Sequence, residues 1–247
     1  MKPIVAIYSS FLQRAYDQIL HDVCIQNLPV VFAIDRAGLV GSDGETHQGI
    51  FDLSYLSSIP NMHIMAPKNK WELSDMVKFA VNFGAPIAIR YPRGEAYDGL
   101  KEFRQPISYG QSEAIYEEED ILLLAVGSMV KVAEAVRAQL KERGYSCSLT
   151  NARFVKPIDE QAVSEATKEH RLIVTMEENV LSGGFGERVR AYVDGLDADC
   201  RVLNIGIPDE YVEHGNVELL KQEVGIDADS IAKRILAEYI MATAKKA

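Results

Sequence analysis

The sequence is poor in cysteine and has no long apolar run. Its 247 residues contain only three cysteines, Cys24, Cys147 and Cys200, whose spacing fits neither a disulfide framework nor a zinc site. We therefore expect reduced thiols and a cytoplasmic protein. No apolar stretch approaches the ~20 residues that a transmembrane helix needs. The first residues lack a cleavage-site pattern, so we also expect no signal peptide.

The sequence also has fewer basic than acidic residues. Acidic residues outnumber basic ones by 36 to 26, which gives a formal net charge of −10 and an isoelectric point near 5.1. On average such a chain repels phosphate polyanions, so general binding to nucleic acid or to anionic membranes is disfavoured, while local basic pockets for small anions remain allowed. The length and the 47% hydrophobic content fit a globular protein of one large or two small domains.

Short β-branched strands alternate with amphipathic helices along the first ninety residues. The apolar spacing predicts strands at Pro3–Tyr8, Pro29–Asp35, Met62–Ala66 and Pro86–Tyr91, and helices at Ser10–Cys24, Phe51–Ser57 and Asn69–Phe83. This alternation indicates a parallel sheet with helices on both faces.

A second alternating series follows the stretch Pro92–Pro106, which has no periodicity. It predicts strands at Ile121–Val126, Ser146–Asn151, Leu172–Met176 and Arg201–Ile205, and helices at Ser128–Arg143, Asp159–Lys168, Gly186–Asp194 and Asp227–Lys245. We predict an α/β protein with two parallel-sheet, three-layer domains. Residues 1–94 and 108–247 form the domains, and residues 95–107 form the linker.

Polar side chains gather where the strands of the first half end. Tyr8, Arg36 and Arg90 stand at or just past the carboxyl ends of predicted strands, and Asp43 and His47 follow in the loop after the second strand. Ligands of open parallel sheets bind at this edge. The sequence therefore predicts a polar site there.

The loop at 36–49 is the most informative segment of the chain. Four glycines in its last twelve residues permit tight backbone paths close to a ligand. Asp43 and His47 could hold a substrate hydroxyl or move a proton. The alternative is a solvated surface loop with local turns.

Arginines and an aromatic residue suggest what this edge binds. Arg90 and Arg93 lie at and just after the end of the fourth predicted strand. A guanidinium group can bind two oxygens of one phosphate or carboxylate at the same time. Together with Arg36 these two arginines indicate an anionic substrate, although an ion pair with the acidic second half explains Arg93 equally well. Phe11, at the start of the first helix, either stacks on a ligand ring or packs into the core.

Two features of the second half are interpreted as structural. The segment Gly183–Gly186 lacks the spacing of a phosphate-binding loop, so we predict a tight turn from strand to helix. Glu177 and Glu178, with Asn179, are expected near a domain surface.

Four blocks of the sequence, in order along the chain, closely resemble the 1-deoxy-D-xylulose-5-phosphate synthase family of transketolase-like, thiamine-diphosphate enzymes. The blocks are Lys2–Gln18, Asp35–Gly49, Arg90–Gly94 and Thr175–Gly184. The resemblance covers only the carboxyl-terminal part of the family's length. It implies a truncated pyrimidine-binding domain followed by the transketolase C-terminal domain.

The resemblance implies condensation of pyruvate with glyceraldehyde 3-phosphate, with loss of carbon dioxide, on a route to isoprenoids and thiamine. By motif match, Tyr8, Arg36 and Arg90 would bind the phosphate of the acceptor. Asp43 and His47 would be the catalytic residues near the reacting carbons.

The cofactor residues implied by the same match are Phe11, which would stack on the aminopyrimidine, and Arg14 beside it. The family's cofactor glutamate, in a Glu-Gln-His motif, and its Gly-Asp-Gly magnesium motif both precede the matched segment. We therefore expect thiamine diphosphate and Mg²⁺ to be bound mainly by that N-terminal portion, with no metal ligand among the residues named here.

We accordingly expect a fragment or split subunit of the synthase that is inactive alone, and that works as a homodimer or with a complementing N-terminal chain. Two alternatives remain. One is the β-type subunit of a two-chain 2-oxo-acid dehydrogenase, against which the blocks Asp35–Gly38 and Arg90–Gly94 argue. The other is a non-catalytic remnant that dimerises through an exposed sheet edge.

Overall fold

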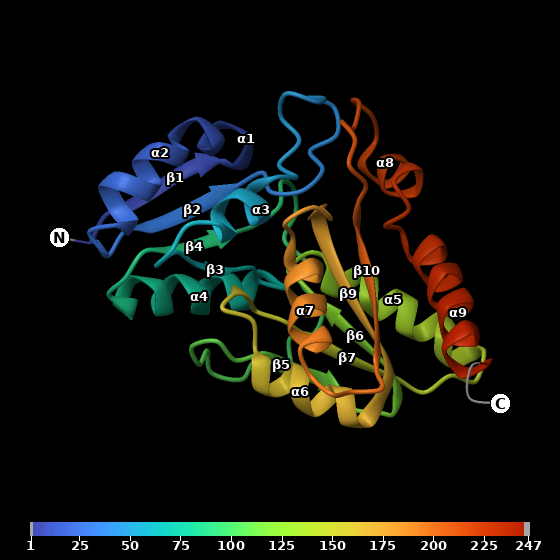
Figure 1. The fold of residues 1–247 in the computed structure, drawn as a ribbon. Coiled ribbons are helices and arrows are strands. Elements are labelled where there is room, and N and C mark those ends of the chain that lie inside the picture. Colours follow the sequence, from blue (N-terminus) through green and yellow to red (C-terminus); the bar gives the residue numbers. More distant parts are fainter. Residues whose placement is uncertain (1, 245–247) are drawn as a thin grey trace.

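Two five-stranded sheets with helices on their faces account for residues 2–244, the part of the chain that the computed structural model describes (Figure 1). The first half contributes β1 (Ile4–Tyr8), α1 (Ser9–Leu12), the 3₁₀ turn η1 (Gln13–Ala15), α2 (Tyr16–Gln18), the π-helical η2 (Ile19–Cys24), β2 (Val31–Asp35), α3 (Asp52–Ser57), β3 (His63–Met65), α4 (Lys70–Phe83) and β4 (Ile87–Arg90). The second half contributes β5 (Glu113–Tyr116), β6 (Asp120–Ala125), α5 (Met129–Glu142), β7 (Cys147–Asn151), β8 (Phe154–Lys156), α6 (Glu160–Glu169), β9 (His170–Val180), α7 (Phe185–Asp194), β10 (Arg201–Ile207), α8 (Val217–Glu223) and α9 (Ala228–Ala244). The predicted α/β fold class is confirmed.

The strand order is β1-β2-β4-β3-β8 in the first sheet and β10-β9-β6-β7-β5 in the second. Neighbouring strands are parallel except at β3–β8 and β5–β7, which are antiparallel. The sheets are therefore mixed at one edge rather than fully parallel. Because β8 comes from the second half but pairs in the first sheet, strand pairing ties the two halves together. The boundary drawn at 95–107 stays a prediction.

Several local features differ from the expectation. The elements β5, β8 and α8 were not predicted, since they have between three and seven residues and too few positions to show periodicity. The helix expected over Ser10–Cys24 is present as four consecutive segments, with a change of backbone angles at Ala15 (φ −99°, ψ 14°). The predicted end of the last helix at Lys245 lies outside the described residues.

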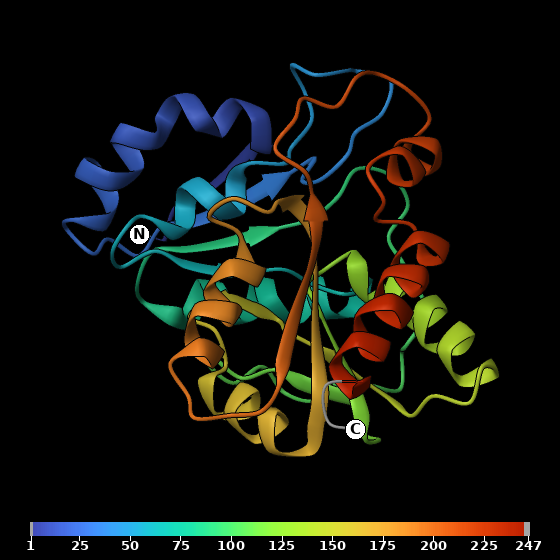
Figure 2. The ribbon, with the colours of Figure 1, turned by 45° about the vertical axis from the view of Figure 1, so that its right-hand side comes forward.

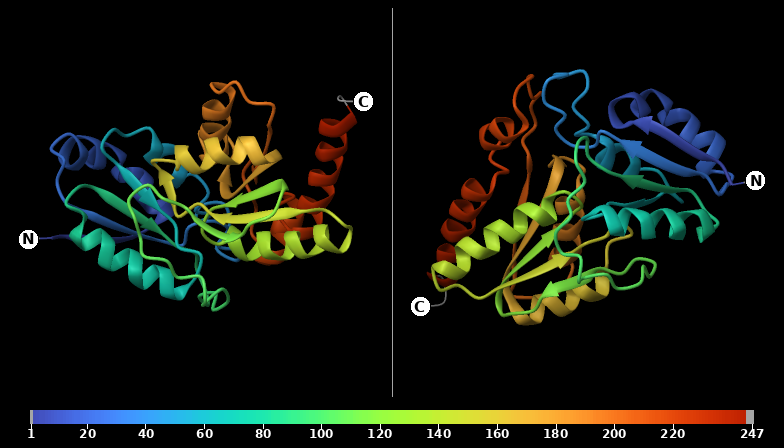
Figure 3. Two further views of the ribbon diagram at one scale, coloured as in Figure 1. Left: turned by 90° about the horizontal axis from the view of Figure 1, so that it is seen from below. Right: turned by 180° about the vertical axis from the view of Figure 1, so that it is seen from behind.

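Helices cover both faces of each sheet. The segment from α1 to η2, with α3, lies on one face of the first sheet, and α4 lies on the other (Figure 3). In the second sheet α5 and α9 cover one face, and α6 and α7 cover the other (Figure 2). Phe32 and Ile34 of β2 share one buried apolar cluster with Leu122 and Leu124 of β6, so the two halves have a common core. None of the helices within residues 2–244 is both long and apolar enough to cross a bilayer.

A buried ion network also joins the halves. Lys68 Nζ lies 2.5 Å from Glu113 Oε2 and 3.2 Å from Glu72 Oε1, and Arg153 lies 2.8 Å from each of the same two carboxylates. All four side chains are at most 2% exposed. Two cations and two anions cancel, which is the condition for burying such charges. Burial alone would raise the pKa of Glu113, but the hydrogen bond from Lys68 and the nearby charges hold it below its usual value.

The substitution Glu113→Gln leaves Lys68 and Arg153 buried against a single carboxylate. We expect it to lower the free energy of unfolding by about 3–5 kcal/mol, because uncompensated buried charge is costly. Urea denaturation followed by circular dichroism measures this loss.

The matched control is Arg104→Ala, which removes a half-exposed pair in which Arg104 Nε lies 2.6 Å from Asp75 Oδ2. That loss should be much smaller than the loss in Glu113→Gln, because solvent screens the pair. Equal losses in the two variants would contradict a structural role for the buried network.

Candidate active site

Three strands of the first sheet end side by side and define the predicted edge. In the strand register Tyr8 pairs with Asp35, and Ile34 pairs with Arg90. The residues at the ends of β1, β2 and β4 therefore start from neighbouring positions. The direction in which each of these side chains points depends on the charged groups near it.

Asp43 holds two guanidinium groups, and one of them, that of Arg36, lies over the ring of Tyr8. Its Oδ2 lies 2.6 Å from Arg36 Nη1 and 3.0 Å from Arg93 Nη1. The guanidinium carbon of Arg36 lies 4.1 Å from the centre of the Tyr8 ring, a cation–π contact. All these side chains are partly exposed. The cluster is therefore an accessible site with two cations on one anion, and the ion pair proposed for Arg93 is made within the first half.

Phe11 and His47 extend this cluster on its aromatic side. Phe11 is 46% exposed, so it is not a core residue. Its ring stacks on Tyr8 at 5.4 Å and meets the His47 ring edge-on at 5.4 Å. His47 Nδ1 lies 2.9 Å from Thr46 Oγ1. The structure thus brings Tyr8, Arg36, Asp43 and His47 together, as the sequence predicted, and adds Phe11 to them.

Arg14 lies just beyond this group. It is exposed, one helical turn after Phe11, and makes no ion pair or hydrogen bond with any residue between 2 and 244. An exposed aromatic face with a neighbouring unpaired cation fits a flat, electron-rich heterocycle. In the described part of the chain, no three His, Cys, Asp or Glu side chains are grouped to hold a metal ion.

The loop that carries Arg36, Asp43 and His47 is anchored rather than solvated. Arg36 itself has φ 55°, in the left-handed region that costs energy for a residue with a side chain and is found at functional sites. Gly38 and Gly49 bind each other through two backbone hydrogen bonds of 2.7 and 2.8 Å. A Cβ on Gly49 would stand 2.1 Å from the carbonyl oxygen of Arg36, so only glycine fits.

The same loop is also fixed to the second half of the chain. Gln48 accepts a hydrogen bond from the Val40 N–H (2.7 Å) and donates one to the carbonyl of Glu213 (3.0 Å). The Gly215 N–H donates to the carbonyl of Gly41 (3.3 Å). The loop and the segment before α8 lie side by side in both Figure 1 and Figure 2. Both halves therefore shape the site.

Arg90 does not join the cluster. It is only 4% exposed, and its Nε donates to Asp52 Oδ2 (2.7 Å) while Nη2 donates to Asp52 Oδ1 and to the carbonyls of Gly49 and Glu178 (3.1 Å each). The expectation that Arg90 faces Arg36 is not met, because the Asp52 carboxylate and these carbonyls hold its guanidinium in the interior. Nη1 is the nitrogen left without a hydrogen bond among the described residues. Burial would lower the pKa of Arg90, but the charge of Asp52 raises it, so the group stays charged.

Asp52 is a site residue that the sequence analysis missed. It is fully buried at the start of α3 and accepts a further hydrogen bond from Ser9 Oγ (3.1 Å). It therefore links the start of α1, the end of β4 and α3. The sequence did contain a signal for this residue: a single acid stands inside the apolar run Ile50–Leu53. A carboxylate buried in such a run needs a cation as its partner.

The expectation that Glu177 and Glu178 lie near a surface is wrong. They are 0% and 3% exposed, because β9 continues past the predicted strand end to Val180 and carries them beneath the loop. Glu178 accepts hydrogen bonds from the Leu39 N–H (3.0 Å) and Ser128 Oγ (2.6 Å). The sequence signal for their burial was that the apolar predicted strand runs directly into these two acids.

Glu177 closes the turn before α7. Its two carboxylate oxygens accept the N–H groups of Phe185 and Gly186, each at 2.8 Å. The tight turn expected at Gly183–Gly186 is present. Burial raises the pKa of Glu177 to about 7, against the lowering effect of these two hydrogen bonds.

Comparison with known proteins gives a consistent result. Residues 1–98 match the transketolase pyrimidine-binding domain, and residues 110–231 match the transketolase C-terminal domain. Proteins named 1-deoxy-D-xylulose-5-phosphate synthase are 55% identical in Lachnoclostridium phytofermentans and 50% identical in Clostridium tetani. The matches cover 95% and 96% of this chain but 38% of each relative. The chain therefore spans 38% of the length of these relatives.

Solved transketolases share the fold. A split-gene transketolase described as an inactive β4 tetramer has a TM-score of 0.86 at 23% identity, over 95% of this chain and 75% of that one. The transketolase of Campylobacter jejuni has a TM-score of 0.75 at 19% identity, over 95% of this chain and 35% of that one. At these identities the likeness concerns the fold alone.

The shared carboxylate predicts that Asp43 competes with an external anion for Arg36 and Arg93. In Asp43→Asn we expect the affinity for inorganic phosphate to rise about twofold to fivefold, the equivalent of one partly exposed ion pair. Isothermal titration calorimetry of the 247-residue chain measures it. Asp98→Asn, which removes an exposed carboxylate 3.7 Å from Lys70, is the control and should change nothing. Weaker phosphate binding in Asp43→Asn would contradict the competition.

The raised pKa of Glu177 predicts a pH dependence of stability. A carboxyl whose folded-state pKa lies above its unfolded value of about 4.5 stabilises the fold fully at low pH, and this contribution is lost as the pH rises through about 7. Between pH 5 and pH 8 the wild-type chain should therefore lose more unfolding free energy than Glu177→Gln does. Urea denaturation at both values measures this, and parallel losses in the two proteins would rule it out.

Proposed function

Because the chain belongs to the transketolase-like family and matches the C-terminal part of 1-deoxy-D-xylulose-5-phosphate synthases, we propose that it supplies half of a thiamine-diphosphate-dependent active site. The complete site joins pyruvate to glyceraldehyde 3-phosphate with loss of carbon dioxide. One observation carries this proposal: two guanidiniums share a single carboxylate beside the aromatic rings of Tyr8 and Phe11.

Tyr8 and Arg36 bind the phosphate of the acceptor aldehyde in this proposal. A dianionic phosphate attracts the guanidinium of Arg36 more strongly than the single charge of Asp43 does, and charge-assisted hydrogen bonds of this kind contribute about 1.5–3 kcal/mol each. The Tyr8 hydroxyl has no hydrogen-bond partner within residues 2–244 and is free to donate. Arg90 contributes through Nη1, while its other two nitrogens stay on Asp52 and the two carbonyls.

Phe11 and Arg14 hold the aminopyrimidine side of the cofactor. The exposed Phe11 face gives a platform for the ring, and Arg14 lies at its border. Thiamine diphosphate, when bound, supplies the nucleophilic carbon that decarboxylation of an oxo acid and carbon–carbon bond formation require. The diphosphate and Mg²⁺ are assigned to the portion of the relatives that precedes the matched region.

Asp43 and His47 act on the reacting groups. The His47 imidazole lies against the edge of Phe11, next to the proposed pyrimidine platform, and Thr46 orients it through Nδ1. Its Nε2 can then exchange a proton with a substrate hydroxyl or carbonyl oxygen. Once phosphate takes Arg36, Asp43 stays paired with Arg93 through Oδ2 and can accept a hydrogen bond from a substrate hydroxyl at Oδ1.

The proposal includes a cytoplasmic location and assembly either as a homodimer or with a chain that carries the N-terminal portion. The split-gene transketolase of similar fold, described as an inactive β4 tetramer, is a precedent for a chain of this kind that assembles without activity. The polypeptide of residues 1–247 by itself is accordingly expected to bind phosphate and to show no condensation.

The test mixes this polypeptide with the portion of the Lachnoclostridium phytofermentans relative that precedes the matched region. With pyruvate, glyceraldehyde 3-phosphate, thiamine diphosphate and Mg²⁺, the mixture should form 1-deoxyxylulose 5-phosphate, and neither part alone should. In the mixture, Arg36→Ala should raise the KM for the aldehyde at least about tenfold and leave that for pyruvate nearly unchanged. Arg143→Ala, an exposed arginine at the end of α5, is the matched control.

Four results would contradict the proposal. Turnover by residues 1–247 alone would refute the inactivity, and equal changes in both KM values would refute the phosphate role of Arg36. Acyl transfer to a lipoyl partner instead of condensation would indicate a 2-oxo-acid dehydrogenase subunit. A mixture that associates but forms no product would favour a non-catalytic remnant.

A further inference from the structure

A second cavity lies in the other half of the chain, away from the strand-end cluster. It has a volume of about 180 Å³ and lies between α6 and the face of β5 and β7, at the edge of the second sheet. Figures 1 and 3 show α6 over this edge. We call it the α6 cavity. The volume is below the range of about 300–1,000 Å³ typical of drug-sized ligands, so it suits a smaller molecule.

The α6 cavity exists because small side chains occupy the sheet beneath it. Ala114 of β5, Ser148 and Thr150 of β7, and Ala152 line its floor, and Ala162 of α6 lines the opposite wall. Larger apolar groups, Leu122 and Leu124 of β6 with Phe154 and Phe185, close its inner side. An apolar molecular body therefore fits between the helix and the sheet.

Five carboxylates and no lysine or arginine line the α6 cavity. Two of the five are committed to the fold. Glu118 pairs with Arg137 and Lys141, and Asp159 accepts hydrogen bonds from Ser112 and from the Ala162 N–H. These two carboxylates are therefore not available to a ligand.

The other three carboxylates face solvent at the mouth of the α6 cavity. Glu165 accepts one hydrogen bond, from the amide of Gln161 (3.0 Å). Glu117 and Glu169 make neither a hydrogen bond nor an ion pair with any residue in the described range 2–244. The mouth therefore carries uncompensated negative charge next to an apolar interior.

The inner wall adds polar groups that are already placed. The buried His170 is held by the Ala166 carbonyl at Nδ1 (3.1 Å) and by Ser148 Oγ at Nε2 (2.9 Å). Thr150 Oγ1 has no hydrogen-bond partner among the described residues, so it is available to a molecule in the cavity. A cavity with an apolar body and a few placed polar groups is typical of small-molecule sites.

We propose that the α6 cavity binds a small organic amine, with its apolar body between α6 and the β5–β7 face and its ammonium group at Glu117 and Glu169. At the mouth of the cavity an anion would be repelled by the carboxylates. A neutral molecule would form no ion pair with them. A metal ion does not need the apolar floor. This site is independent of the strand-end cluster and of the function proposed for it.

The test uses three probes of nearly equal size: benzylamine, benzyl alcohol and benzoate. Each is titrated into the ¹⁵N-labelled 247-residue chain and followed by NMR at the amides of Thr150 and Ala166. Benzylamine should bind most tightly, benzyl alcohol more weakly and benzoate weakest. Equal affinities, tighter binding of benzoate, or shifts confined to other residues would overturn the proposal.

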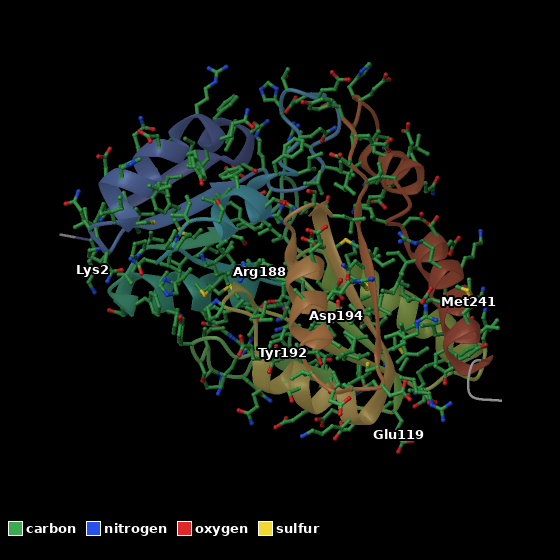
Figure 4. All side chains as sticks on the ribbon, in the orientation of Figure 1. Lys2, Glu119, Arg188, Tyr192, Asp194 and Met241 are labelled. Atoms are coloured by element: carbon green, nitrogen blue, oxygen red, sulfur yellow. The ribbon has the colours of Figure 1, made fainter. Side chains whose placement is uncertain are left out.

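Two variants separate shape from charge. Ala114→Leu fills the α6 cavity from an exposed position on the edge strand, and should weaken binding of benzylamine and benzyl alcohol at least about tenfold. Glu169→Gln should weaken benzylamine about twofold to fivefold and leave benzyl alcohol unchanged. Glu119→Gln is the charge control, because Glu119 lies on the outer surface and does not line the cavity (Figure 4).

Ala162→Leu fills the same space from the helix and serves as a second blocking variant. Thermal unfolding identifies which blocking variants are folded, and Glu169→Gln changes only an exposed side chain, so at least one comparison remains interpretable. Benzylamine binding that survives in a folded blocking variant, or that is equal in Glu169→Gln and wild type, would overturn the assignment.

Discussion

The buried guanidinium of Arg90 is the interaction on which the geometry of the candidate site depends. It joins the end of β4 to Asp52 of α3, to the glycine bridge of the loop through Gly49, and to β9 of the second half through Glu178. Removing either charge of such a pair leaves the other buried and unpaired, which costs about 3–5 kcal/mol. This ion pair therefore holds the loop that carries Asp43 and His47 from beneath, while Gln48 and Gly41 bind it to the second half of the chain. The position of the loop in turn determines where the aromatic rings and cations of the cluster lie relative to one another.

Arg36, directly after β2, and Arg90, the last residue of β4, show how burial gives two similar groups different roles. Arg90 is held in place by Asp52 and two carbonyls through Nε and Nη2, whereas Arg36 shares the partly exposed Asp43 with Arg93, a contact that contributes at most about 1 kcal/mol. An incoming phosphate can displace a pair of the second kind and cannot displace one of the first. This difference makes the rim adaptable on a rigid base, which is the arrangement that binding sites need.

The sequence was sufficient for most of the fold because long elements repeat their pattern many times. The helix at Asn69–Phe83 and the strand at Ile121–Val126 were found within a residue or two of their observed ends. The strand β8 was not, because its three residues become a strand only by pairing with β3. At the site, periodicity placed Tyr8, Arg36 and Asp43 at one edge. It could not tell that Asp52 turns Arg90 inward, nor that Glu178 lies buried, because both depend on contacts between distant segments.

The net charge of −10 led to the expectation that nucleic acid and anionic membranes are disfavoured while local pockets for small anions remain allowed, and the structure shows why the average charge decides little at a single site. Charges in water act over a Debye length of about 8 Å at physiological salt, so a ligand responds to the groups that line its own site. At the strand-end cluster two guanidiniums face one carboxylate, and the local charge is positive. At the α6 cavity no cation lines the wall, and the local charge is negative. One acidic chain thus carries a group of cations at the strand ends of its first half and a group of carboxylates at the α6 cavity of its second. The distribution of charge, rather than its sum, determines what each half can bind.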